Sequence, residues 1–200
     1  MPSLGCSTAT WGRRLMNADV VLSRLLAAAG RLGEMEPPDD AGAYIVLIDE
    51  PRSLASVPIP ASRAIYLGIG ASLLQRDLKT HFSTGMTGSS TLRRSLGASL
   101  RQQLKLHPRP RGRATSRRDY THYCFDEAGE ERLTKWMNAH LRLGVHELTS
   151  PKAIEGRLIQ LARPPLNLTK WKNPWGQTLR GLRAECVRQA LASFPLRGRS

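Results

Sequence analysis

A tyrosine and an arginine near the middle of the chain could act together in chemistry. Tyr66 lies in the segment AIYLGIG (64–70), where alternation typical of a strand gives it an alanine and two glycines as neighbours on its face. These small residues leave room beside the phenol ring for a ligand, although a half-buried tyrosine that packs over a helix is the simpler interpretation. Arg76 follows ten residues later, on the polar side of a predicted helix.

A glutamate near the other end of the chain needs a partner. Glu155 lies in the segment SPKAIEGRLIQLA (150–162), which begins with a serine cap and a proline at the first helical position. On a helical wheel of about 100° per residue, Glu155 falls inside the arc that contains Ile154 and Leu158. An uncompensated buried charge is very costly, so we expect a partner for it. The sequence leaves three candidates: a structural arginine, a metal ion or a reacting water.

The hydrophobic patterns predict an α+β domain, in which helices alternate with a few short strands. The strands are expected at 43–49, 64–70, 119–125 and 142–148, and the helices at 11–33, 72–82, 91–104, 126–141 and 150–162. Ser90 or Thr91 could cap the helix at 91–104.

The composition favours a polyanionic partner. The 200 residues carry a net charge of +14, and nucleic acid is the commonest partner of so basic a protein, with an anionic membrane surface as the alternative. No apolar run approaches the roughly 20 residues of a membrane span, so we expect no membrane association. The three scattered cysteines form no CxxC pair, which favours reduced thiols and a cytoplasmic location.

Taken together, these residues resemble the GIY-YIG nuclease superfamily. The two name motifs appear as GAY (Gly42 to Tyr44) and YLG (Tyr66 to Gly68), Arg76 matches the arginine of the following helix, and AIEGRLIQLARPPLN (153–167) resembles the segment with the glutamate and asparagine. The resemblance covers roughly residues 42–170. It implies an endonuclease-like fold with a small central, mostly antiparallel sheet of three or four strands flanked by helices.

The resemblance also implies a metal-dependent endonuclease that hydrolyses phosphodiester bonds in DNA. The implied metal ligand is Glu155, with Mg²⁺ (or Mn²⁺) as the cofactor, and Arg76 would hold the scissile phosphate. Either Tyr44 or Tyr66 would orient or deprotonate the water, and Asn167 would support the site by hydrogen bonding. His81 is a further candidate, but it follows Arg76 by five residues, which is about 140° around a regular helix. We therefore expect His81 to point away from Arg76.

The chain divides into three predicted parts: an N-terminal extension and acidic linker (1–41), the nuclease-like domain (42–170) with a basic, exposed loop at 105–118, and a basic tail (171–200). The residues expected to contact nucleic-acid phosphates are basic: Arg93, Arg94, Arg109, Arg111, Arg113, Arg117 and Arg118. For Arg93 and Arg94 a solvated helix face is the other interpretation. Two alternatives to a nuclease stay open: a catalytically silent nucleic-acid-binding protein on this scaffold, and a basic structural protein.

Overall fold

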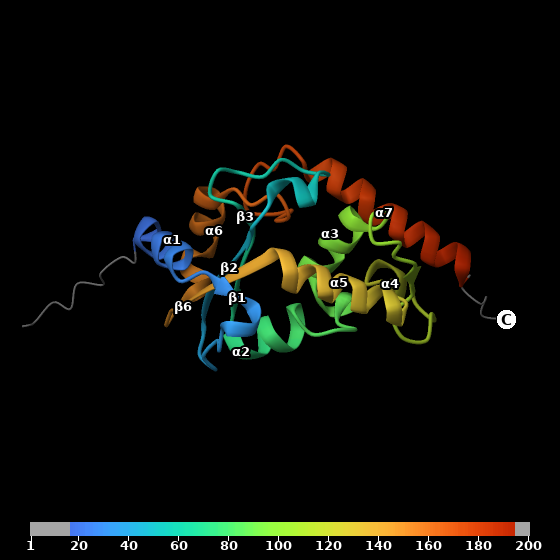
Figure 1. Ribbon diagram of the computed structural model, residues 1–200, viewed down its shortest axis with the longest axis horizontal. Coiled ribbons are helices and arrows are strands. Elements are labelled where there is room, and N and C mark those ends of the chain that lie inside the picture. Colours follow the sequence, from blue (N-terminus) through green and yellow to red (C-terminus); the bar gives the residue numbers. More distant parts are fainter. Residues whose placement is uncertain (1–16, 195–200) are drawn as a thin grey trace, which may run out of the picture.

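The computed structural model describes residues 17–194, whose helices and strands form two groups at opposite ends of the molecule (Figure 1). A sheet with α1 and α6 forms one end, and α3, α4, α5 and α7 form the other. The helices are α1 (Ala18–Ala27), α2 (Leu73–Arg76), α3 (Thr91–Leu100), α4 (Arg117–Thr121), α5 (Glu127–His140), α6 (Pro151–Ala162) and α7 (Gly176–Ser193). The strands are β1 (Gly30–Arg31), β2 (Gly42–Ile48), β3 (Ala64–Gly70), β4 (Pro108–Arg109), β5 (Cys124–Phe125) and β6 (Leu141–Glu147).

The central sheet has four strands in the order β1-β6-β2-β3, and each neighbouring pair is antiparallel. This arrangement confirms the predicted α+β class with a small antiparallel sheet. The register of β2 against β3 sets Tyr44 opposite Gly68 and Val46 opposite Tyr66. Because opposite residues of an antiparallel pair share a face, Tyr44 and Tyr66 project from the same side of the sheet.

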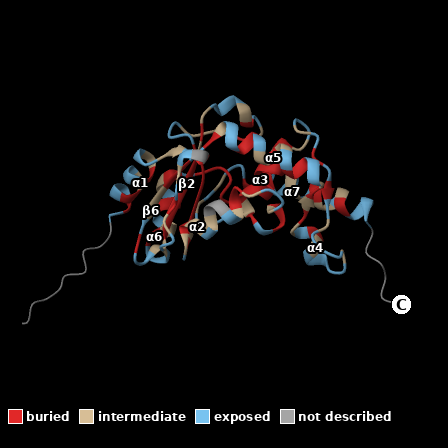
Figure 2. Ribbon diagram, turned by 60° about the horizontal axis from the view of Figure 1, so that its bottom comes forward, coloured by how far each residue is buried: buried red, intermediate tan, exposed pale blue. Residues whose placement is uncertain are grey.

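Helices cover both faces of the sheet and bury two hydrophobic cores. The face that carries Tyr44 and Tyr66 packs against Leu92 and Leu96 of α3 and Met137 of α5. The opposite face packs against α1 and α6. Figure 2 shows the buried residues concentrated in the strands and along α3. Within residues 17–194, no helix is long and apolar enough to cross a membrane.

The start of α3 follows directly from the sequence. The Ser90 side chain caps this helix by accepting a hydrogen bond from the Arg93 N–H at 3.1 Å, as the sequence predicted. The strand predictions for 43–49 and 64–70 are confirmed to within a residue by β2 and β3.

Several predicted elements differ in the structure. The strand expected at 119–125 is wrong in its first half: a capping box between Ser116 and Asp119 begins α4, and only Cys124 and Phe125 form β5. The helix expected at 11–33 ends at Ala27, since the chain then forms β1 against β6. The first part of that prediction, residues 11–16, lies outside the described residues. The basic tail contains α7, which packs on α3.

The helix expected at 72–82 has a different form. Only Leu73–Arg76 is α-helical, and Asp77–His81 continues as a π-helix. A π-helix is rare and often occurs at functional sites.

Candidate active site

The two motif tyrosines meet on one face of the sheet, because Tyr44 packs directly over Gly68. A Cβ atom added at Gly68 would lie 2.3 Å from the phenolic oxygen of Tyr44, so only glycine leaves space for that ring. The ring centroids of Tyr44 and Tyr66 are 6.1 Å apart and the rings are nearly stacked. The room that the sequence predicted beside Tyr66 is therefore occupied by the other motif tyrosine.

His81 completes a group of three rings. Its Nε2 lies 2.7 Å from the hydroxyl of Tyr44, and its Nδ1 lies 2.6 Å from the hydroxyl of Ser90. The centroid of its ring is 5.3 Å from that of Tyr44 and 6.0 Å from that of Tyr66. We refer to Tyr44, Tyr66 and His81 as the three-ring cluster. Ser90 was predicted only as a helix cap, and no signal in the sequence pointed to its contact with His81.

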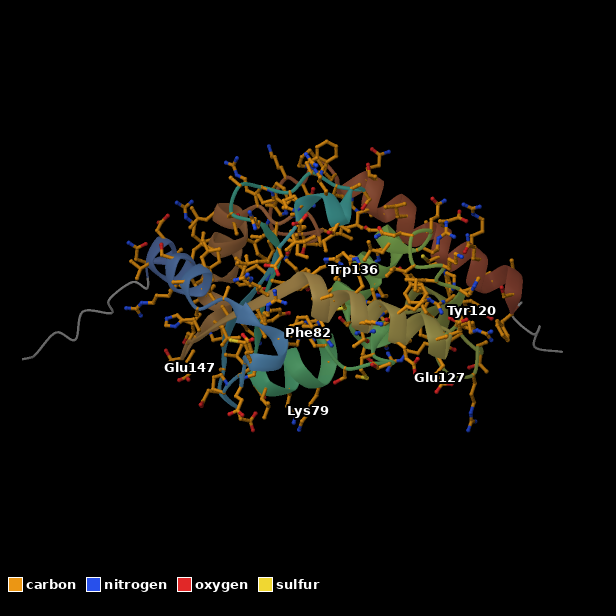
Figure 3. The ribbon with its side chains drawn as sticks, in the orientation of Figure 1. Lys79, Phe82, Tyr120, Glu127, Trp136 and Glu147 are labelled. Carbon is orange, nitrogen blue, oxygen red and sulfur yellow. The ribbon has the colours of Figure 1, made fainter. Side chains whose placement is uncertain are left out.

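The π-helix turns His81 differently from the regular helix that the sequence argument assumed. In a regular helix a residue five positions after Arg76 points away from it, whereas the i→i+5 hydrogen bonds of a π-helix widen the turn and bring that residue back. His81 is consequently buried in the core beside Tyr44. The same turn leaves Lys79 exposed and Phe82 in the interior (Figure 3).

Burial keeps His81 neutral. Burial, followed by the positive charges of Arg76 and Arg93, lowers the pKa of His81 from 6.5 to about 3. A neutral imidazole donates through one nitrogen and accepts through the other. Since its two neighbours are hydroxyl groups, His81 can accept from Ser90 and donate to Tyr44, or the reverse.

Tyr66 is the residue on which the candidate groups converge. Burial raises the pKa of its phenol, while the positive charge of Arg76 and a hydrogen bond from Tyr44 lower it. Glu155 also raises this pKa, and Arg94 lowers it. These interactions reach Tyr66 from α2, β2, α6 and α3, so side chains that are far apart in the sequence act on one phenol.

Glu155 has a lysine as its partner. The ammonium group of Lys170 forms an ion pair with its carboxylate, and 16% of the Glu155 side chain is exposed against 43% of that of Lys170. The sequence argument predicted a partner for Glu155, but a lysine was not among its three candidates. Beside the pair lies a pocket of about 710 Å³, and half of the residues that line it are basic: Gln160, Arg163, Lys170, Trp171, Lys172 and Pro174.

Asn167 binds the backbone next to Tyr66. Its Oδ1 accepts from the N–H of Leu67 at 2.9 Å, and its Nδ2 donates to the carbonyl of Leu67 at 2.7 Å. The backbone N–H of Leu166 also donates to the carbonyl of Ile65 at 3.0 Å. This segment therefore fixes the middle of β3, and Asn167 acts on Tyr66 through the strand.

The prediction that Arg93 contacts phosphates is wrong, because its side chain is 0% exposed. Its guanidinium group forms an ion pair with Glu130 of α5 at 2.8 Å and also donates to Thr87 and Thr134. A signal for Glu130 existed in the sequence: it is three residues before Leu133 and seven before Met137, which places it on the apolar face of α5. The argument applied to Glu155 would also have predicted a buried partner for Glu130.

The remaining predicted contact residues are distributed around the basic loop. Arg94 is buried, whereas the arginines of the loop are exposed: Arg109, Arg111, Arg113, Arg117 and Arg118. The loop is more ordered than expected, because it contains β4 and the start of α4. Arg109 also lies over the ring of Phe194, 5.2 Å from its centroid. Their contacts with nucleic acid remain predictions.

Comparison with known families gives a match that covers most of the described residues. A family model described as the GIY-YIG catalytic domain matches residues 45–185, which is more than half of the chain. The chain belongs to the GIY-YIG family. No curated protein and no solved structure gives a significant match.

The match to the GIY-YIG family clarifies what the sequence resemblance covers. It begins one residue after Tyr44, inside β2, and continues past the predicted boundary at 170 into α7. GIY-YIG proteins are nucleases, so the family gives this chain its broad class.

Proposed function

We propose that this GIY-YIG chain is a metal-dependent endonuclease that hydrolyses phosphodiester bonds in DNA. The observation that carries the proposal is that the rings of Tyr44 and His81 pack against Tyr66, whose phenol also lies within the electrostatic range of Arg76 and Glu155. Hydrolysis of a phosphodiester needs an activated water and neutralisation of the charge that develops on the phosphate. A phenol, a guanidinium group and a carboxylate within electrostatic range of one another supply groups suited to these tasks.

In this proposal Arg76 holds the phosphate that is cut. Its planar fork suits a phosphate better than the point charge of a lysine does. The positive charge also acts on the two titratable rings beside it, since it lowers the pKa of both Tyr66 and His81. Arg76 would therefore neutralise the phosphate and make the phenol of Tyr66 easier to deprotonate.

Tyr66 is the better candidate for the base. A hydrogen bond with Tyr44 lowers its pKa, and in this proposal the hydroxyl of Tyr44 is the donor and the Tyr66 oxygen the acceptor. The Tyr44 oxygen can then accept from Nε2 of His81, and Nδ1 of His81 can accept from the hydroxyl of Ser90. With this orientation, each hydrogen bond from Ser90 through His81 and Tyr44 is donated in the direction of Tyr66. The last of these bonds stabilises the phenolate of Tyr66. Tyr44, His81 and Ser90 would thus be positioning residues.

Glu155 would hold the metal ion. Within residues 17–194 no group of three or more histidine, cysteine, aspartate or glutamate side chains could hold a metal ion. In this proposal, water and the phosphate supply the ligands that the protein does not. One carboxylate fits Mg²⁺ or Mn²⁺, because Mg²⁺ keeps several waters and takes few protein ligands. The carboxylate of Glu155 already faces a cation, the ammonium of Lys170. When bound, the metal would lower the pKa of a coordinated water and neutralise phosphate charge.

The ion pair at Glu155 also favours a second candidate, a catalytically silent protein that binds nucleic acid on the same scaffold. An ammonium group that neutralises the carboxylate competes with a metal ion for the same oxygen atoms. If a metal cannot displace Lys170, the chain would bind nucleic acid without cutting it.

Cleavage of supercoiled plasmid and of branched DNA in Mg²⁺ or Mn²⁺ tests the proposal. The expected result is cleavage by the wild type that EDTA abolishes and that Tyr66→Phe reduces by at least about 100-fold, the usual contribution of a positioned acid–base group. Tyr120→Phe is the matched control, since Tyr120 bonds the backbone of Phe194 at the other end of the molecule. Cleavage by Tyr66→Phe at the wild-type rate would refute the assignment of the base. Salt-sensitive binding without cleavage by the wild type would favour the silent protein.

A further inference from the structure

Two neighbouring arginines of α3 are buried, but only one of them is neutralised. Arg93 pairs with the carboxylate of Glu130 and donates to several further acceptors. Arg94 is 6% exposed and has no carboxylate partner among the described residues. A buried charge without a counter-charge is costly, so the difference between these two positions needs an explanation.

The hydrogen bonds of Arg94 are incomplete. Its Nη1 donates to the carbonyl of Gly88 at 2.7 Å and its Nη2 donates to Thr91 at 3.2 Å. Its Nε is buried and has no hydrogen-bond partner. A guanidinium group carries five N–H donors, and three of those on Arg94 are therefore left for a ligand.

The surroundings of Arg94 are positively charged. Arg111 of the basic loop donates to the same Gly88 carbonyl, at 3.4 Å, so two guanidinium groups share one acceptor. Burial and then the charge of Arg183 on α7 lower the pKa of Arg94 to about 10, and Arg111 contributes in the same direction. Within residues 17–194 none of these three arginines forms an ion pair. Three segments far apart in the sequence thus bring positive charge to one place.

Arg94 is linked by its charge to the three-ring cluster, and Arg183 lines an open pocket. The charge of Arg94 reaches Tyr66 and lowers the pKa of that phenol. Arg183 lines a pocket of about 310 Å³ between α4 and α7, together with Arg180 and Thr121. Tyr123, which also lines this pocket, donates its hydroxyl to the carbonyl of Arg94 at 2.7 Å, so the pocket lies beside the backbone of Arg94.

We propose that Arg94, Arg111 and Arg183 bind a phosphate group of a nucleic-acid backbone, at a position separate from the phosphate that Arg76 would hold. The assignment of the ligand to nucleic acid rests on the proposed function. A phosphate oxygen would accept from the free donors of Arg94 and would offset the repulsion among the three guanidinium groups. The site therefore binds a phosphate that flanks the cut. This contact would fix the position of the nucleic-acid strand relative to Tyr66.

Thermal unfolding in inorganic phosphate tests the site on the full chain without cleavage. At constant ionic strength, replacing chloride by phosphate should raise the Tm of the wild type. Arg94→Met removes the buried charge but keeps an unbranched apolar side chain as far as the ε position. It should unfold at the wild-type Tm or higher in chloride and lose most of the phosphate-dependent rise. Arg31→Met, which removes an exposed arginine at the far edge of the sheet, is the matched control and should keep that rise.

Binding of a labelled DNA duplex in EDTA shows whether the phosphate belongs to nucleic acid. The slope of log Kd against log salt should fall by about 0.9 for the loss of one phosphate contact in Arg94→Met, and by a similar amount in Arg183→Met. Arg31→Met should keep the wild-type slope. Arg183→Met changes only a half-buried side chain, so it tests the site even if Arg94→Met fails to fold.

The outcomes separate the site from the nuclease proposal, because neither arm requires cutting. A phosphate-dependent Tm rise that both variants lose, together with a reduced slope, supports the site whether or not the chain cleaves DNA. If the variants lose the phosphate-dependent rise in Tm but keep the wild-type slope of log Kd against log salt, the assignment to nucleic acid is overturned and a site for free phosphate is left. A rise that Arg94→Met and Arg183→Met retain in full would overturn the site.

Discussion

The buried histidine of the three-ring cluster predicts an acid-sensitive fold. His81 is neutral in the folded protein because burial, Arg76 and Arg93 lower its pKa to about 3, whereas the unfolded chain binds a proton with a pKa near 6.5. The unfolded state therefore binds more protons than the folded state below about pH 6.5. The stabilising contribution of the neutral ring is present above pH 6.5 and is lost progressively as the pH falls toward 3.

The size of the effect follows from the two pKa values. Each pH unit below the unfolded pKa costs up to 1.36 kcal/mol, so His81 should remove about 2 kcal/mol from the free energy of unfolding between pH 7 and pH 5. This figure is insensitive to the folded pKa as long as that pKa lies well below 5. His81→Gln has no titrating ring and should lose about 2 kcal/mol less over the same range.

Urea unfolding at pH 7 and pH 5 measures the difference directly, because the free energy of unfolding is obtained at each pH from the midpoint and slope. The control is His107→Gln, which removes an exposed histidine and should keep the wild-type pH dependence. If the wild type and His81→Gln lose the same free energy between pH 7 and pH 5, His81 is not held neutral and the account of the three-ring cluster is wrong.

Three other substitutions test the contacts that position the site. Gly68→Ala would force a Cβ atom into the Tyr44 phenol and should lower the free energy of unfolding by about 1–3 kcal/mol in urea titrations and reduce any DNA cleavage; wild-type behaviour would contradict the close packing. Glu130→Ala leaves Arg93 buried without its counter-charge and should lower the free energy of unfolding by about 3–5 kcal/mol. A decrease of less than about 1 kcal/mol would contradict this account of the ion pair. Asn167→Ala removes two hydrogen bonds to the backbone of β3 and should cost about 2–4 kcal/mol, and amide hydrogen exchange in β3 should then accelerate; unchanged exchange would refute its positioning role.

The sheet and its two tyrosines could be predicted from the sequence because short strands with alternating faces carry their own signal. Tyr66 and its small neighbours indicated a space on one face of a strand, and the structure fills it with Tyr44. Glu155 was found by the same kind of argument, as a charge within an apolar arc. In both cases the sequence revealed the unusual residue, and only the fold identified the partner.

The failures have physical reasons of their own. The angle of about 140° between Arg76 and His81 assumed a regular α-helix. The π-helical turn at Asp77–His81 changes that angle and brings His81 into the core. Arg93 was assigned to a solvated face or to phosphates because its partner lies on a helix thirty-seven residues away. The helix α7 was missed because its buried positions include the small residues Cys186 and Ala190 and form no leucine stripe.

Metal-dependent cleavage of DNA by the wild type and by Glu155→Gln tests the central claim most directly. Glu155→Gln keeps the size of the side chain but removes the charge that a metal ion and Lys170 both require. The account predicts that the wild type cuts in Mg²⁺ or Mn²⁺ and that Glu155→Gln does not, while both bind the duplex in EDTA and Glu131→Gln, an exposed control on α5, cuts like the wild type. Equal cleavage by the wild type and Glu155→Gln would contradict it.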